Sequence, residues 1–267
     1  MRAPKLIALE STRKRVLAFH FSPNAKTFHI VVKMKDVPGA TSNVLGMLSQ
    51  RVDLIGSTSY SLDDGSAIWS GFVRSLRHGE TAKSLEGVLA SSPVVREYLV
   101  AASDKGLLVD SYHSGVETGP GRPAALMPLA GFTHMFERLV RDFGSGGETI
   151  LFEEGSALGK SSGEYLKSHM GAGSLDWKTR ALVSMFRSIG YGSPTLKVLE
   201  GERKYSIVFR DCFECSSAPG KRKECGFFRG QLAATISTLA GEQFTSQEVK
   251  CRLRGDPYCE FRVNAKD

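Results

Sequence analysis

The sequence lacks any apolar run near the roughly 18 residues that a membrane helix needs, so no membrane span is expected. Its N-terminus lacks a clean apolar core followed by a cleavage site, so no secretory signal is expected either. The composition, 41% hydrophobic and 24% charged, is typical of soluble globular proteins. Together these features predict a cytoplasmic protein of one large domain or two ordinary ones.

Motifs of common enzymes are also missing. The segment GSALGKSSG at 155–163 resembles a phosphate-binding loop, but three residues separate Gly155 from Gly159 where the Walker pattern has four. The six histidines include no H-E-x-x-H pair, and no helix-turn-helix pattern or nicotinamide or flavin fingerprint is found. An enzyme is therefore the less favoured interpretation, although the sequence does not decide the question.

Positive charge is concentrated at the N-terminus. The net charge is +7, and residues 1–35 hold eight Lys or Arg and a single acid, Glu10, whereas the rest of the chain holds 27 residues of each sign. Such a basic segment can contact nucleic acid or an acidic partner. The favoured alternative is a solvated edge that resists aggregation.

A stretch rich in Gly, Pro and Ser, SYHSGVETGPGRP at 111–123, predicts a linker between domains covering residues 1–110 and 124–267. Before it, residues 15–103 predict the order strand, helix, strand, strand, helix, strand, with a hairpin turn at Asp63-Asp64-Gly65. The segment RVLAFHF can add a strand. This βαββαβ order is ferredoxin-like, an antiparallel sheet with two helices on one face.

The junction between the first strand and the first helix reads D-x-P-G at 36–39, and Thr41 or Ser42 can cap the helix. This motif and the element order resemble an ACT domain over residues 27–102. The resemblance implies a regulatory module that dimerises, hence a homodimer. Because many ACT domains bind an amino acid at this loop, it also implies a ligand site formed by Gly39, Ala40, Thr41 and Asn43.

After the linker, the pattern predicts an α+β domain in which apolar helices pack on an antiparallel sheet. A helical stripe is formed by Leu129, Phe132, Phe136, Leu139, Val140 and Phe143. Ser174 can cap a second helix that Gly190 ends. A hairpin turning at Gly201, a helix over 226–241 and a final hairpin around Gly255 complete the chain.

The final hairpin places Cys251 and Cys259 on facing strands if the strands pair about Gly255. The two thiols can form a disulfide, fill the core, or supply half of a metal site. Glu248 stands three residues before Cys251, and Cys225 stands just before a helix, which a disulfide would not need. Zinc takes four such donors in a tetrahedron. In a reducing compartment, clustered cysteines more often bind metal.

These residues carry a second resemblance. The stretches 127–159 and 224–263 resemble a 4-vinyl reductase domain, and the resemblance covers residues 123–264. In phenol-responsive transcription activators of this family, three cysteines and a glutamate hold zinc. The match implies a structural Zn²⁺ ion bound by Cys225, Glu248, Cys251 and Cys259. The implied fold is related to haem-NO-binding and vesicle-tethering-subunit domains.

The same resemblance implies a small-molecule sensor with an apolar pocket between helices and sheet. Its occupant would be a hydrophobic or aromatic molecule, with Phe132, Phe136, Trp177 and Tyr205 as the candidate ligand-binding residues. The alternative is that these aromatic side chains are ordinary core. Separately, Cys212 and Cys215 form a C-x-x-C that can be a redox pair, half a metal site or an accessory structural pair.

The predicted function is therefore a ligand-responsive regulator. Its zinc-stabilised sensor domain would pass a signal through an ACT-like dimer or to a partner protein. Two alternatives are an enzyme related to tetrapyrrole reductases and a DNA-associated transcriptional regulator that uses residues 1–35.

Overall fold

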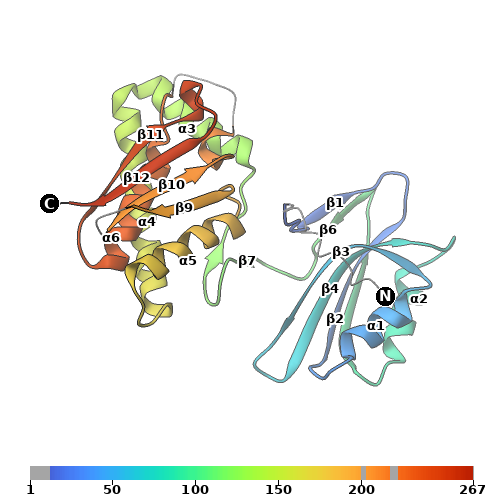
Figure 1. Ribbon diagram of the computed structural model, residues 1–267. Coiled ribbons are helices and arrows are strands. Elements are labelled where there is room, and N and C mark those ends of the chain that lie inside the picture. Colours follow the sequence, from blue (N-terminus) through green and yellow to red (C-terminus); the bar gives the residue numbers. More distant parts are fainter. Residues whose placement is uncertain (1–12, 200–202, 217–221, 267) are drawn as a thin grey trace, which may run out of the picture. The chain divides into compact units, whose positions relative to one another are not determined.

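The computed structural model describes residues 13–199, 203–216 and 222–266. The chain forms two compact units, residues 1–116 and 117–267, each described separately below (Figure 1). Much of the predicted basic segment, residues 1–12, lies outside the described residues, and so does the turn expected at Gly201. No helix of the described residues is long and apolar enough to cross a membrane.

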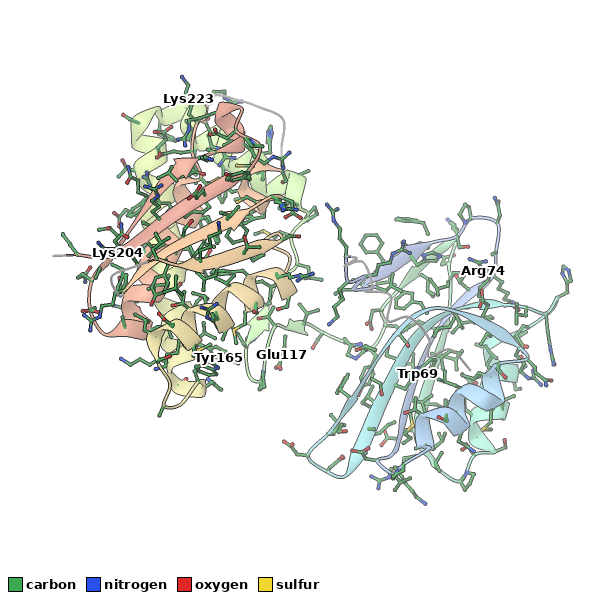
Figure 2. The ribbon with its side chains drawn as sticks, in the orientation of Figure 1. Trp69, Arg74, Glu117, Tyr165, Lys204 and Lys223 are labelled. Atoms are coloured by element: carbon green, nitrogen blue, oxygen red, sulfur yellow. The ribbon has the colours of Figure 1, made fainter. Side chains whose placement is uncertain are left out.

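The first unit is built on a four-stranded antiparallel sheet in the order β3-β4-β2-β5. In chain order its elements are β2 (Thr27–Lys35), α1 (Ala40–Leu48), β3 (Val52–Ser61), β4 (Ser66–Ser75), α2 (Ala82–Ala90) and β5 (Val95–Ala102). Alternate residues of β2, from Phe28 to Met34, share one core with α1, α2 and Trp69 of β4 (Figure 2). Since side chains alternate across a strand, both helices cover the same face of the sheet.

Three local predictions for this unit have different outcomes. The turn at 63–65 is confirmed, with Gly65 at φ 71° and Asp64 accepting a hydrogen bond from the Ser66 backbone. The prediction that Thr41 or Ser42 caps α1 is wrong, because Gly39 is the N-cap and its φ of 87° is a left-handed conformation that glycine readily adopts. The segment RVLAFHF contributes β1 (Phe19–Phe21), which pairs with β6 (Leu107–Val109) in a separate two-stranded sheet.

The second unit has a four-stranded antiparallel sheet in the order β11-β12-β10-β9. The strands are β9 (Pro194–Val198), β10 (Lys204–Phe209), β11 (Phe244–Lys250) and β12 (Cys259–Ala265). The helices are α3 (Leu129–Phe143), α4 (Ser145–His169), α5 (Leu175–Ser188) and α6 (Gly226–Ala240). Shorter elements are the strands β7 (Val116–Glu117) and β8 (Pro123–Ala124) and the 3-10 helices η1 (Phe213–Cys215) and η2 (Arg252–Arg254). The mixed α+β class is confirmed.

The longest helix, α4, is not among the elements predicted from the sequence. Its Gly155, Gly159 and Gly163 recur at four-residue spacing and face α6. A Cβ at Gly155 would overlap the Phe227 carbonyl, and one at Gly159 would lie 2.5 Å from the Gln231 carbonyl oxygen. The glycines therefore serve close packing of two helices. The segment that resembles a phosphate loop is mid-helix, and so is the G-x-S-x-G at 159–163, which thus lacks the turn of a nucleophile elbow.

The predicted stripe of α3 is only partly buried. Phe136 and Val140 lie in the core, whereas Phe143 is 64% exposed and Leu129 lies near the surface. In α5, by contrast, the predicted ends are confirmed. The Ser174 side chain accepts a hydrogen bond from the Trp177 backbone, and Gly190 follows the helix at φ 92°.

The contact between α4 and α6 predicts opposite effects for two alanine substitutions in one helix. Gly159→Ala should lower the free energy of unfolding by about 1–3 kcal/mol, because the new methyl group overlaps backbone of α6. Gly146→Ala is the matched control, since nothing lies within 4 Å of its Cβ position, and it should be neutral or stabilising by about 0.5–1 kcal/mol. Denaturant unfolding of both variants tests this, and equal effects would contradict the packing.

Candidate metal centre

The five cysteines converge in the second unit, in what is called here the sulfur cluster. All five are buried and none forms a disulfide. They come from four places in the chain, with Cys212 and Cys215 at η1, Cys225 just before α6, Cys251 just after β11 and Cys259 opening β12. The Sγ of Cys215 lies 3.0 Å from that of Cys225, and 3.4 and 3.8 Å from those of Cys259 and Cys251. The Sγ of Cys225 lies 3.9 Å from Cys251 and 4.0 Å from Cys259.

A buried carboxylate completes the cluster. Glu248, on β11, is only 7% exposed, and its Oε2 accepts a hydrogen bond from the Cys225 backbone N–H at 2.8 Å. Its Oε1 is buried and has no hydrogen-bond partner among the described residues. Because buried carboxylate oxygens are ordinarily paired with donors or cations, this oxygen beside several thiols fits a metal ion.

Two sets of four donors have all their ligand atoms within 4.8 Å of one another. One set is Cys225, Glu248, Cys251 and Cys259, and the other is Cys212, Cys215, Cys225 and Cys259. Thiolates with or without a carboxylate are the ligands of structural zinc sites. The cluster can therefore hold a metal ion, and it contains two donors more than a four-coordinate ion uses.

The ionisation of the cluster reflects the same crowding. Burial raises the pKa of the Cys225 thiol, and burial together with the charge of Cys251 raises the pKa of Glu248 to about 9. Hydrogen bonds from Cys215 and Cys225 lower the pKa of Cys251 to about 7. Negative charge is thus confined by the fold to few positions. A cation among these groups would favour the ionised forms of all of them.

The final hairpin differs from its prediction in one respect. β11 pairs with β12, but the register shifts between Glu248 and Lys250, and Cys251 leads into η2 before the turn at Gly255. Leu253 is therefore in a 3-10 helix, so the expected strand face shared by Cys251 and Leu253 is wrong. The irregular backbone, with Gly255 at φ 94°, brings Cys251 back toward Cys259.

An ion pair that the sequence interpretation missed holds η1 in place. Glu214, between Cys212 and Cys215, accepts hydrogen bonds from the backbone N–H groups of Phe227 and Phe228 at the start of α6. Arg222 donates to the Glu214 carboxylate at 2.9 Å and to its carbonyl at 2.7 Å. Burial raises the pKa of Glu214 to about 7, against the opposing effect of Arg222. The acid thus caps α6 beside Cys225.

The predicted ligand-binding aromatic residues do not form one group. Phe132 and Phe136 of α3 pack against each other, with ring centroids 4.5 Å apart, and both contact Phe227. Trp177 is 49% exposed on α5. Tyr205 of β10 is fully buried, and its hydroxyl donates to Asp176 at 2.9 Å.

The loop predicted to bind an amino acid is engaged in the first unit's own structure. Ala40 is buried, the Asn43 side chain accepts a hydrogen bond from Ser92 at 2.8 Å, and the Thr41 hydroxyl lies 4.0 Å from the Met34 sulfur. A cavity of ≈ 300 Å³ lies elsewhere in this unit, between α1, β3 and β4, and the loop residues from Gly39 to Asn43 do not line it.

Comparison with known proteins finds a family match for the segment that holds the cluster. The family model of the vinyl-4-reductase domain matches residues 206–265, so the 4-vinyl reductase part of the resemblance is confirmed. An uncharacterized protein of Methanocaldococcus jannaschii is 26% identical over 125 residues, which is 46% of this chain and 68% of that protein.

Two solved structures are also similar. The phenol-responsive sensory domain of the transcription activator PoxR, solved with phenol, is 14% identical, with TM-score 0.48, over 86% of this chain and 92% of that one. A vinyl-4-reductase family protein from Methanocaldococcus jannaschii is 21% identical, with TM-score 0.36, over 54% of this chain and 85% of that one. Both TM-scores are below 0.5, so the match to the family model is the finding that characterises the second unit.

The cluster predicts that Cys259→Ser abolishes metal binding, because Cys259 belongs to both donor sets. Loss of the metal should cost about 3 kcal/mol or more, which lowers the melting temperature by roughly 6–12 °C. Metal content by mass spectrometry and thermal unfolding measure the two effects. Cys212→Ser is the control, since it leaves one set whole. Full metal stoichiometry in Cys259→Ser would show that the centre is wrongly assigned.

The buried ion pair gives a second prediction. Arg222→Met leaves Glu214 buried without its cation, which should cost about 3–5 kcal/mol in the free energy of unfolding. Glu137→Gln, which removes a partly exposed partner of the same arginine, should cost less. Denaturant unfolding compares them. A cost for Arg222→Met no larger than that for Glu137→Gln would contradict the capping role.

Proposed function

We propose that residues 124–267 form a small-molecule sensor domain whose C-terminal hairpin is held by a structural zinc ion. The observation that carries the proposal is that the segment matching the vinyl-4-reductase family model contains all six donors of the candidate centre. These donors join η1, the start of α6 and the final hairpin, which are far apart in the sequence. A metal there would hold the sheet edge against α6.

The ligands in this proposal are Cys225, Glu248, Cys251 and Cys259. Three thiolates and a carboxylate fill a tetrahedral zinc site, which leaves no open position for substrate, so the ion is structural. Glu248 Oε1 supports its inclusion, because this buried oxygen has no other partner among the described residues. Glu248 Oε2 meanwhile orients Cys225 through its backbone N–H.

The sensing part of the proposal rests on the aromatic side chains beside the cluster. Phe213 of η1 and Phe227 of α6 lie one and two residues from Cys212 and Cys225, and both pack against Phe132. An aromatic or apolar molecule that enters among these rings would favour one arrangement of α3, η1 and α6 over another. Metal ligands on η1 and α6 would keep that change small and reproducible.

The first unit, in this proposal, is an ACT-like regulatory module over residues 1–110, and 111–123 is the linker. Support comes from its element order and from the D-x-P-G loop at the β2–α1 junction. Dimerisation of this module would pass the signal of the second unit to a second copy or to a partner protein.

Native mass spectrometry of the purified protein tests the proposal. We expect a homodimer with one zinc ion per chain and, in part of the molecules, an added organic mass. Phenol, a minimal aromatic probe, should raise the melting temperature of the wild type. Phe136→Ala should weaken that shift, whereas Trp177→Ala, on an exposed side chain, should leave it unchanged. Equal shifts in both variants, or no response to phenol together with no organic mass, would contradict aromatic sensing by these residues.

A further inference from the structure

The Cys215 thiol lies where a fourth metal ligand would be. Its Sγ contacts those of Cys225, Cys259 and Cys251 at 3.0, 3.4 and 3.8 Å. The other two distances known in this group, from Cys225 to Cys251 and Cys259, are 3.9 and 4.0 Å. Four thiolates around zinc, at about 2.3 Å from the metal, lie about 3.8 Å from one another. The four sulfurs therefore approximate one tetrahedron.

The distances also indicate a single metal position. Two ions that shared Cys225 and Cys259 would hold Cys215 and Cys251 on separate metals, at opposite ends of the pair. The 3.8 Å between Cys215 and Cys251 instead matches an edge of one coordination sphere. The extra donors of the sulfur cluster are thus alternatives for one ion.

The donor that Cys215 would displace is Glu248. Glu248 already has a second task, because its Oε2 accepts the backbone hydrogen bond of Cys225. It can therefore leave a metal without losing its place in the fold. Cys251, in contrast, lies in both tetrahedra, as do Cys225 and Cys259.

We propose that Cys215 and Glu248 exchange as the fourth ligand of one divalent ion, with Cys225, Cys251 and Cys259 bound throughout. This rests on the proposed metal centre. In the exchange the metal–oxygen bond to Glu248 breaks, the metal–sulfur bond to Cys215 forms, and the thiol proton of Cys215 passes to the Glu248 carboxylate. Charge is conserved and the metal keeps its oxidation state, so no oxidant or reductant is needed.

The exchange would regulate the sensor, because Cys215 is carried by η1. The same short helix places Phe213 against Tyr191 and Phe132, with ring centroids 4.4 and 6.1 Å apart, and places Glu214 at the start of α6. A displacement of Phe213 by a bound molecule would move Cys215 relative to the other three sulfurs. The choice of fourth ligand would then report occupancy among the rings.

X-ray absorption at the zinc edge, with zinc content measured in parallel, tests the exchange. Glu248→Gln should retain one zinc per chain with four sulfur ligands. Cys215→Ser should retain one zinc with three sulfurs and one oxygen. The double variant Glu248→Gln/Cys215→Ser should lose zinc. Cys212→Ser in the Glu248→Gln background is the matched control from the same C-x-x-C, and it should keep four sulfurs.

Other outcomes would overturn the exchange. Three sulfurs or loss of zinc in Glu248→Gln would show that Cys215 does not replace the carboxylate. A drop in sulfur count with Cys212→Ser in that background would assign the ligand to Cys212 instead. Failure of the metal centre itself looks different, because the wild type would then bind no zinc. Circular dichroism of each variant shows whether a loss of zinc reflects unfolding.

Discussion

The structure of the second unit depends on the burial of acidic groups in one place. Five thiols and the Glu248 carboxylate share an interior site in which no side chain or backbone donor of the described residues reaches the free carboxylate oxygen. Like charges at such distances cannot all ionise without a cation, and neutral groups would leave the carboxylate poorly satisfied. A divalent ion resolves this conflict and at the same time joins η1, α6 and the final hairpin.

Two other contacts bring the donors to that site. The glycines of α4 let α6 approach until backbone meets backbone, which fixes the position of the helix that follows Cys225. Glu214 then joins the start of α6 to η1, and Arg222 compensates the buried charge and reaches α3 through Glu137. Because both partners of this ion pair are buried, its geometry tolerates little change. The sulfur cluster is therefore built on a rigid support on one side.

The sequence was informative where chemistry or turn geometry leaves few choices. The spacing of Cys225, Glu248, Cys251 and Cys259 brought together a set of donors that the structure does place within 4.8 Å. The turn at Gly65 and the Ser174 cap were likewise predictable from local preferences. The helix α4 escaped prediction, because glycine in isolation disfavours a helix, while here the tight contact with α6 requires it. Cys215 and Glu214 were missed as neighbours of the cluster because only tertiary folding brings η1 beside the hairpin.

The C-x-x-C acquires meaning from that tertiary contact. Its four residues provide two sulfurs, an aromatic ring and a helix-capping acid, and each of these faces a different neighbour. Phe213 contacts the rings around α3, Glu214 contacts the backbone of α6, and Cys215 contacts three other sulfurs. A rotation of so short an element changes all three contacts together, since a single 3-10 turn has little internal freedom. Coupling between an aromatic ligand and the metal centre would therefore need no long pathway, because one turn of helix borders both.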